Sequence, residues 1–438
     1  MSADSTTRAD ALARYRADAL AAALDLPPFR RRAGTLEDAR EDVAPIVADV
    51  ADRGDDAVAD WSRRLDGIAP DPLAVPPDPD GEGLPPEARE ALVLAAERIR
   101  RFHERTAPER RVSAGDGLAM ERVFEPFDRV GLYVPGGRAA YPSTVLMLAI
   151  PARVAGVERV VAVTPPGPGG EVGPGVRFAA HLAGVDDLFA VGGAQGIASL
   201  AFGTSTVPRV RAIVGPGNRW VTAAKALVAD RVAIDMPAGP SEIAILADRV
   251  ADPDWAAADV LAQLEHDPDA RALVVSPDPR WLDAVDAALE RRLPELATAE
   301  TIRSALAESA AIVVPDLELG AEVVSAWAPE HLSIVVEDAE SIVERVRGSG
   351  ATFVGAAAPV ALGDYVAGPN HTLPTGGTAA FRSGLGVEAF GRWTSVVREA
   401  SPEVVDPLLG AAAALADLEG LPAHAASLRA RRARGGGA

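Results

Sequence analysis

A glutamate and a histidine stand side by side after a proline in the stretch APEHL, residues 328–332. Glu330 and His331 precede the apolar run 332–336, which has the composition of a buried strand. An unpaired buried charge is costly, so the pair lies either at an exposed strand end or beside a cleft. In a cleft, a histidine with a pKa of about 6.5 and an adjacent carboxylate can serve as a general base and a water activator.

Two further segments carry side chains that bind metals through nitrogen or oxygen. In QLEHDPD, Gln263 and His266 are three positions apart at the end of a predicted helix, so both project from one face. They can share a metal ion, or they can be a solvated helix end whose dipole favours a histidine. In GDYVAGPNH, Asp364 and His371 lie in a predicted loop. Asp364 is either an oxygen ligand or a turn former, and His371 either orients a ligand or bonds the backbone.

The stretch EGLPAH joins two predicted helices near the end of the sequence. Gly420 ends the first helix, and Pro422 takes the first position of the second, which proline favours. Glu419 and His424 flank this corner, which can present both side chains in one direction. The alternative is an acidic helix end beside a surface histidine. Of the two other histidines, His103 lies in a predicted charged helix and His181 in the stretch FAAHLAG, and we interpret both as structural or solvated.

Glycine-rich turns follow three predicted strands: VPGGR, VGGAQG and VGPGN. Ligands of a doubly wound sheet bind outside the carboxyl ends of the strands. Glycine there lets the backbone approach a phosphate, and the following helix N-terminus favours anions. Tyr133, Gln195 and Asn218 lie in or beside these turns and are candidate nucleotide contacts. The G-x-G-x-x-G fingerprint is absent, so ordinary tight turns are the alternative.

These residues must be positioned by ten short β-rich runs that alternate with Ala-rich or amphipathic stretches. Such alternation is typical of parallel sheets covered on both faces by helices. The sequence therefore predicts an α/β fold of two tandem Rossmann-like doubly wound units, with helical N- and C-terminal arms. The predicted strands are 129–134, 159–164, 187–191, 211–215, 231–236, 242–248, 272–276, 311–315, 332–336 and 352–356.

Helical patterns separate and flank these runs, and the last sixty residues carry no strand pattern. The predicted helices are 8–24, 35–65, 86–106, 254–266, 279–292, 299–308, 338–347, 402–418 and 422 to about 432. The stretch 69–88 is rich in proline and aspartate and is predicted to be a surface loop. The predicted domains are an N-terminal helical arm (1–27), a first α/β domain with most of the site residues (28–128 plus 237–378), a second, nucleotide-binding domain (129–236) and a C-terminal helical arm (379–438).

Charge and composition narrow the function classes. The 438 residues have a formal net charge of −20, which disfavours nucleic acids and anionic membranes as partners. No apolar run approaches the length of a membrane helix, and no signal peptide is apparent, so we expect a cytoplasmic protein. Cysteine is absent, so any metal must be held by nitrogen and oxygen, and no thiol can attack an aldehyde. Lys225 is the single lysine, so arginine supplies nearly all of the positive charge, which we interpret as compositional bias.

Eight of these segments form an ordered series along the chain. They are GLYVPGG, GGAQGIASLAFG, GPGN, IDMPAGPSE, QLEHDPD, APEHL, GDYVAGPNHTLPTGG and EGLPAH. Each is weak alone, but the ordered set is specific, and over essentially its whole length the chain resembles the histidinol dehydrogenases. The resemblance implies a zinc- and NAD-dependent enzyme that oxidises L-histidinol through L-histidinal to L-histidine, the last step of histidine biosynthesis.

The resemblance also implies a role for each candidate residue. The implied ligands of one zinc per subunit are Gln263, His266, Asp364 and His424. The implied acid/base pair is Glu330 and His331, and the implied NAD contacts are Tyr133, Gln195 and Asn218. The implied substrate contacts are Ser241, Gln263, His266, His331, Asp364, Glu419 and His424. Family members are homodimers whose C-terminal arm completes the neighbour's site, so Glu419 and His424 would act across the interface.

Three alternatives compete with this interpretation. A paralogue could oxidise another polar alcohol, such as a sulfopropanediol, but the carboxylate of Glu419 would repel a sulfonate. A zinc hydrolase using Glu330 would leave the glycine-rich turns unexplained, and a non-catalytic binding protein would leave the ordered motifs unexplained. The chain departs from the family pattern at Ala380, where arginine is expected, and at Arg382, where a small residue is expected.

Joint action of Glu330 and His331 carries a geometric requirement. Adjacent side chains of an extended strand point to opposite faces of the sheet. We therefore expect irregular backbone at 329–331, with the strand beginning only at Leu332.

Overall fold

The computed structural model describes residues 11–30, 36–113, 118–136, 140–236, 239–398 and 402–435. The chain divides into two compact units. The main unit comprises Met1–Thr106 and Phe127–Phe390, and the second unit comprises Ala107–Pro126 and Gly391–Ala438. No helix among the described residues is long and apolar enough to cross a membrane.

The main unit contains a five-stranded parallel sheet, in the order β6-β5-β4-β7-β8. Its strands are β4 (Arg129–Tyr133), β5 (Arg159–Thr164), β6 (Asp187–Ala190), β7 (Ala212–Val214) and β8 (Ala233–Ile234). The connecting helices are α5 (Pro142–Ala155), α6 (Pro174–Ala183), α7 (Gly193–Phe202) and α8 (Arg219–Leu227). Alternate strand residues enter different cores: Leu132 packs in the core that includes α5 and α6, and Val161 in the one that includes α7 and α8.

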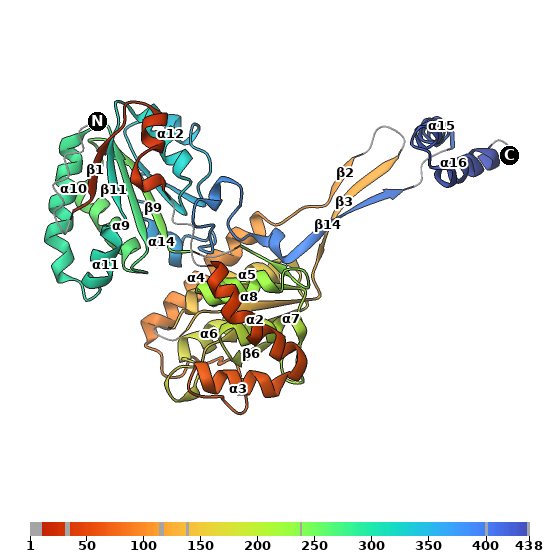
Figure 1. Ribbon diagram of the computed structural model, residues 1–438, viewed down its shortest axis with the longest axis horizontal. Coiled ribbons are helices and arrows are strands. Elements are labelled where there is room, and N and C mark those ends of the chain that lie inside the picture. Colours follow the sequence, from red (N-terminus) through yellow and green to blue (C-terminus); the bar gives the residue numbers. More distant parts are fainter. Residues whose placement is uncertain are drawn as a thin grey trace. The chain divides into compact units, whose positions relative to one another are not determined.

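The main unit also contains a six-stranded parallel sheet, in the order β1-β11-β10-β9-β12-β13. Its strands are β1 (Ala13–Arg16), β9 (Glu242–Ala247), β10 (Arg271–Ser276), β11 (Ala310–Val313), β12 (His331–Val335) and β13 (Ala351–Val354). One face is covered by α9 (Pro253–Leu264), α10 (Pro279–Arg292) and α11 (Ala299–Leu306). The other is covered by α1 (Leu20–Leu24), α12 (Leu317–Trp327) and α13 (Ala339–Val343) (Figure 1). Both sheets share a doubly wound order, with a switch point between β4 and β7 and another between β9 and β12.

All ten predicted strands are confirmed to within two residues at each end. The predicted N-terminal helical arm is wrong, because residues 13–16 form β1, which pairs in parallel with β11. Alanine-rich composition favours a helix there, but the open edge of the sheet supplies backbone partners. Leu12 and Ala17 are buried on either side of β1.

Residues 36–105 pack with the five-stranded sheet, so their predicted assignment to the other α/β domain is wrong. They form α2 (Leu36–Arg53), α3 (Asp55–Leu65) and α4 (Pro86–Arg105). Helix α2 packs on α7 and α8, and α4 packs on α5. The single helix predicted at 35–65 is interrupted at Gly54, whose φ of 59° lies in the left-handed region that glycine favours.

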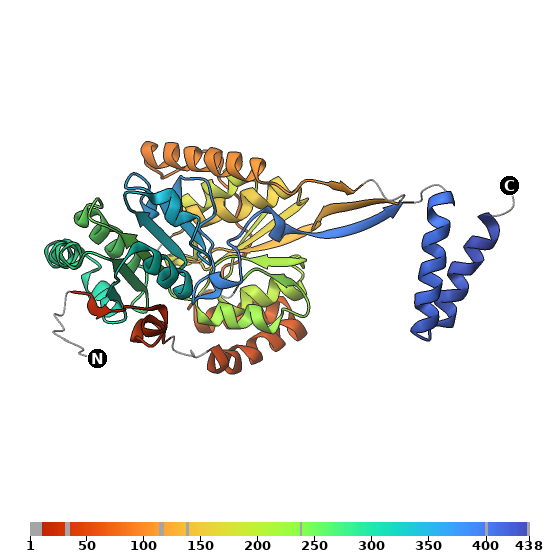
Figure 2. The same ribbon diagram turned by 90° about the horizontal axis from the view of Figure 1, so that it is seen from above.

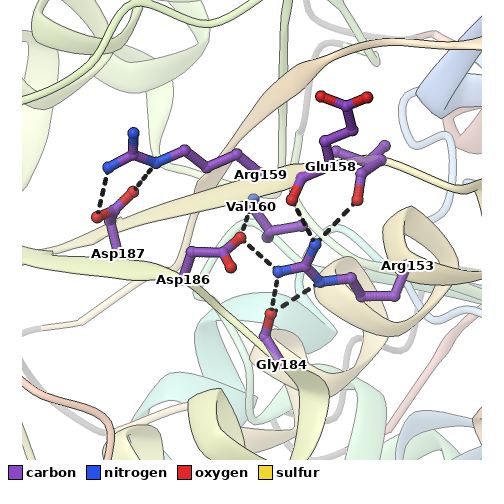
Figure 3. Close-up of polar contacts among 8 residues, drawn as sticks. Arg153, Glu158, Arg159, Val160, Gly184, Asp186 and Asp187 are labelled. Atoms are coloured by element: carbon purple, nitrogen blue, oxygen red, sulfur yellow. Dashed lines mark hydrogen bonds and ion pairs between the residues drawn. The ribbon is translucent and has the colours of Figure 1, made fainter.

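A polar cluster closes the amino ends of β5 and β6 (Figure 3). Arg153, at the end of α5, donates to the carbonyl oxygens of Glu158 at 3.0 Å and Gly184 at 2.8 Å. It also pairs with Asp186, whose carboxylate accepts a hydrogen bond of 2.6 Å from the backbone of Val160. These contacts satisfy the groups at this edge within the protein, and the candidate nucleotide contacts lie at the opposite edge.

The second unit combines a three-stranded antiparallel sheet with two helices. Its elements are β2 (Arg111–Ser113), β3 (Ala119–Pro126), β14 (Gly391–Arg398), α15 (Pro402–Leu418) and α16 (Pro422–Gly435). Helices α15 and α16 lie side by side, and the predicted break between them is confirmed (Figure 2). The prediction of no strand in the last sixty residues is wrong. Strand β14 pairs along its whole length with β3, and Trp393 packs edge-on against Phe124 across the pair.

Candidate active site

Glu330 and His331 meet at the amino edge of the six-stranded sheet. Helix α12 ends at Trp327, its capping residue Ala328 has a φ of 50°, and Glu330 lies in a bend. His331 is already the first residue of β12, so the prediction that the strand begins at Leu332 is wrong by one residue. The irregular backbone before His331 nevertheless brings its Nδ1 to 3.6 Å from Oε2 of Glu330.

Burial sets the proton affinities of this pair. Burial raises the pKa of Glu330 well above its usual value, and the carboxylates of Glu242 and Asp364 raise it further. The backbone N–H of Glu242 opposes this by donating to Glu330 Oε2 at 2.9 Å. Burial lowers the pKa of His331 to about 4, so this imidazole is neutral near pH 7. Its Nδ1 has no hydrogen-bond partner among the described residues, which leaves a neutral base at a buried site.

Asp364 approaches His331 from the other side. It lies in α14 (Val360–Tyr365), rather than in the predicted loop, and its Oδ1 is 3.7 Å from His331 Nε2. His371 lies in the following loop, and its Nδ1 donates to the backbone oxygen of Asp364 at 2.8 Å. His371 Nε2 is 3.4 Å from the hydroxyl of Thr144. His371 is therefore bonded to the backbone, in a position that orients the segment carrying Asp364.

Gln263 and His266 lie at the end of α9, which packs against α14. The helix ends at Leu264, earlier than predicted, so His266 lies in a bend beyond it. Gln263 is buried and His266 is exposed. Although burial is the main cause of the low pKa values of His331 and His371, the charge of His266 lowers both further. His266 is thus within electrostatic range of both rings.

The donor set at this edge fits a zinc ion. An amide, an imidazole and a carboxylate, from Gln263, His266 and Asp364, are the nitrogen and oxygen ligands that a chain without cysteine requires. No group of three or more His, Asp or Glu side chains placed to hold a metal exists within the described ranges. The amide of Gln263 is not of that type, and His424 belongs to the second unit.

Ser241 lies at the same amino edge of the six-stranded sheet as Glu330 and His331. This is not the edge at which doubly wound sheets usually bind their ligands. Ser241 directly precedes β9, and His331 pairs in register with Ile243 at the start of that strand. Ligands of doubly wound sheets usually bind at the carboxyl edge. A cavity of about 500 Å³ lies there, among Asp248, Asp278 and other residues that follow the strands, and it contains none of the predicted site residues.

A second cavity, of about 400 Å³, is lined by His331 and His371. His103, at the end of α4, also lines it and is 1% exposed. The interpretation of His103 as structural or solvated left it out of the candidate site residues. The available signal was spacing: His103 continues the buried stripe formed by Ala96 and Ile99.

Tyr133, Gln195 and Asn218 lie at the carboxyl edge of the five-stranded sheet. Tyr133 ends β4 and accepts a hydrogen bond of 3.2 Å from the backbone of Gly193. Burial raises its pKa to about 12, so it is a neutral phenol. Gln195 is fully buried; its amide nitrogen donates to Asp66 at 3.0 Å, and its Oε1 has no partner among the described residues. Asn218 is exposed and caps α8.

The turn that carries Asn218 is held by a buried ion pair. Gly215, with a φ of 122°, packs so tightly that a Cβ would lie 2.2 Å from the backbone oxygen of Tyr133. Lys225 donates to the Gly215 oxygen at 3.0 Å and pairs with Asp235, which accepts from the Gly215 N–H at 2.6 Å. The single lysine is therefore a structural residue of this turn. Residues 137–139 of the first glycine-rich turn lie outside the described residues.

The remaining predicted residues are Glu419 and His424 near the C-terminus, and Ala380 and Arg382 in the loop that departs from the family pattern. Glu419 follows α15 and His424 lies in the first turn of α16, both exposed, on either side of Gly420 with its φ of 70°. They belong to the second unit, whereas the other site residues belong to the main unit. In the loop that departs from the family pattern, Ala380 is exposed, and Arg382 donates to the backbone oxygen of Asp235 at 3.4 Å.

Comparison with known proteins points to a single family. The family model described as histidinol dehydrogenase matches residues 29–432. The histidinol dehydrogenase of Parasynechococcus marenigrum (strain WH8102) is 45% identical over 414 residues, which cover 93% of this chain and 94% of that protein. That of Synechococcus sp. is 47% identical over 397 residues, covering 89% and 91%. The crystal structure of histidinol dehydrogenase from Elizabethkingia anophelis matches with a TM-score of 0.91 and 31% identity, covering 96% of this chain and 98% of that one.

Proposed function

This chain belongs to the histidinol dehydrogenase family, and on that premise we propose that it oxidises L-histidinol through L-histidinal to L-histidine with zinc and NAD. The observation that carries the proposal is the buried cluster at β12. There a neutral imidazole lies 3.6 Å from the carboxylate of Glu330 and 3.7 Å from that of Asp364. Such a cluster can take a proton from an alcohol and hold the resulting imidazolium.

The first oxidation needs a base and a hydride acceptor. His331 takes the hydroxyl proton of the alcohol as the hydride departs, which leaves the aldehyde. NAD⁺ held by Tyr133, Gln195 and Asn218 would accept the hydride and become NADH. The low proton affinity of His331 keeps it neutral and ready to accept. The carboxylate of Asp364, 3.7 Å from Nε2, stabilises the charged ring until the proton leaves.

The second oxidation needs an added water, because the chain has no cysteine to form a thiohemiacetal. Glu330 removes a proton from this water as it adds to the aldehyde, giving a gem-diol. Burial raises the pKa of Glu330, which makes its carboxylate a stronger base than an ordinary one. His331 then takes a hydroxyl proton of the gem-diol as the second hydride departs, and the product is the carboxylic acid. A second NAD⁺ would accept that hydride.

The cofactor contacts are proposed from the donor types. Zinc bound by Gln263, His266, Asp364 and His424 would orient the amine and imidazole of the substrate and polarise its oxygen. For NAD, the neutral phenol of Tyr133, the unpartnered Oε1 of Gln195 and the exposed amide of Asn218 offer hydrogen bonds. They surround the switch point between β4 and β7, where nucleotides bind in doubly wound sheets.

The second unit is proposed to act on a neighbouring subunit in a homodimer. Glu419 and His424 are exposed on either side of one corner, so they are available to another chain. Glu419 would bind the imidazole or amine of histidinol together with Ser241. We also propose a cytoplasmic location, since the reaction consumes NAD. The alternative sulfopropanediol substrate is not favoured, because the curated relatives described above are histidinol dehydrogenases.

Zinc-loaded protein supplied with L-histidinol and excess NAD should form two NADH for each histidine. Absence of NADH would refute the proposed function.

His331→Ala should abolish the first hydride transfer while zinc content stays at one per subunit. Glu330→Gln should allow histidinal formation but slow its oxidation by about 100-fold or more. His181→Ala, a change at an exposed histidine, is the matched control. Loss of zinc in both active-site variants would show that the assigned roles are wrong.

A further inference from the structure

We propose that His103 is a further substrate-contacting residue, whose ring forms a hydrogen bond, directly or through one water, with a polar group of the molecule oxidised beside His331. The inference rests on the proposed function, because it concerns the same pocket. His103 comes from α4, far in sequence from every other candidate residue, and lines the 400 Å³ cavity together with His331 and His371.

The imidazole of His103 is a deeply buried polar ring. His103 is 1% exposed, and neither Nδ1 nor Nε2 has a hydrogen-bond partner among the described residues. Buried polar groups in native proteins are almost always hydrogen-bonded, since an unsatisfied one is destabilising. The one ring contact that α4 itself supplies is edge-on packing against Phe102, at 5.3 Å between centroids, which satisfies no nitrogen.

Two neighbouring polar side chains of the cavity, those of Asn370 and His371, are already hydrogen-bonded within the protein. The amide of Asn370 donates to the backbone oxygen of Met147 and accepts from the backbone of Thr372 at 2.8 Å. His371 is bonded to the backbone of Asp364. His331 Nδ1, by contrast, is unpartnered among the described residues, like the nitrogens of His103. Unused imidazole nitrogens from α4 and β12 thus border one cavity.

The chemistry of the ring defines what it can bind. Burial lowers the pKa of His103 to about 4, so near pH 7 it offers one N–H donor and one acceptor. Apolar side chains, including Phe353 and Leu385, form other parts of the cavity wall. A neutral donor–acceptor pair in such surroundings matches a small polar molecule with hydroxyl or imidazole groups, which is the substrate class of the proposed reaction.

Two substitutions at His103 separate substrate binding from structural support. His103→Leu keeps the apolar bulk and removes both nitrogens, whereas His103→Asn restores a donor and an acceptor. We expect His103→Leu to lower kcat/KM for L-histidinol by about 10- to 100-fold, the usual effect of losing one such hydrogen bond. His103→Asn should recover at least part of that loss. KM for NAD should stay within about twofold, because the NAD contacts lie at the other sheet.

Thermal unfolding of the ligand-free proteins supplies the structural readout. An unsatisfied buried imidazole contributes no hydrogen bond to the free protein, so His103→Leu should keep or raise Tm. The inference is overturned if His103→Leu leaves kcat/KM unchanged, or if Tm falls and KM for NAD rises together with the loss of activity. An inactive wild-type protein would instead refute the proposed function. If His103→Leu fails to fold, His103 has a structural role, and this outcome counts against the inference. The inference then stands only if His103→Asn is soluble and shows a selective rise in KM for histidinol.

Discussion

Removing the charge of Lys225 should destabilise the main unit by about 3–5 kcal/mol. The ammonium group and its partner Asp235 are almost completely buried, with side-chain exposures of 4% and 1%. In Lys225→Met the carboxylate keeps its hydrogen bond of 2.6 Å from the Gly215 N–H but loses its counter-charge. An uncompensated buried charge is the source of the expected loss.

The size of the effect should depend on whether the partner charge is still present. In the double variant Lys225→Met with Asp235→Asn no charge remains, and the asparagine side-chain oxygen can still accept from Gly215. Its loss should be no more than about 2 kcal/mol, the cost of imperfect hydrogen bonding alone. The two substitutions should therefore be non-additive by more than about 1 kcal/mol, as expected for groups in direct contact.

The same substitution should weaken NAD binding, because Lys225 also donates to the oxygen of Gly215, in the turn that leads to Asn218. Urea denaturation of the wild type, both single variants and the double variant measures the coupling, and titration with NAD measures binding. Asp128→Asn is the control, since the pair of Asp128 with Arg211 is well exposed and should contribute less than about 1 kcal/mol. If Lys225→Met costs no more than this control, the buried pair does not support the turn.

Two further predictions concern pH and assembly. Burial raises the pKa of Asp259 in α9 from the ordinary value of 3.8 to about 6, so the folded chain binds this proton more tightly than the unfolded chain. Its contribution to stability is therefore greatest below pH 4 and is lost as pH rises to about 6, so Asp259→Asn should raise Tm more at pH 7.5 than at pH 4.5; an equal gain at both would contradict this. For the proposed arm exchange, mixing inactive His331→Ala and His424→Ala proteins under conditions that exchange subunits should restore activity, because one site of each mixed dimer is intact. Persistent inactivity despite exchange would show that each chain uses its own arm.

Local pattern was enough to predict the strands and the glycine-rich turns. The apolar runs of β4 to β13 are short and bounded by polar or glycine residues, and a strand buried on both faces needs little else to be recognised. The absence of cysteine by itself restricts the metal ligands to nitrogen and oxygen and excludes a covalent thiol route for aldehyde oxidation. The ordered motifs led to the family that the comparisons support.

Only the tertiary structure shows the features that depend on residues distant in sequence, namely the strands β1 and β14 and the placement of the site residues. Strand β1 forms because β11 offers its edge, and β14 because β3 lies opposite, although neither segment is predicted to be a strand from its local sequence. The placement of Glu330 and His331 at the amino edge follows from the pairing of β12 with β9, which no local spacing encodes. The structural role of Lys225 follows from its buried pair with Asp235. The role proposed for His103 follows from its burial and from the absence of a hydrogen-bond partner among the described residues. Periodicity reports which face of an element is apolar, whereas a site depends on which elements the folded chain brings together.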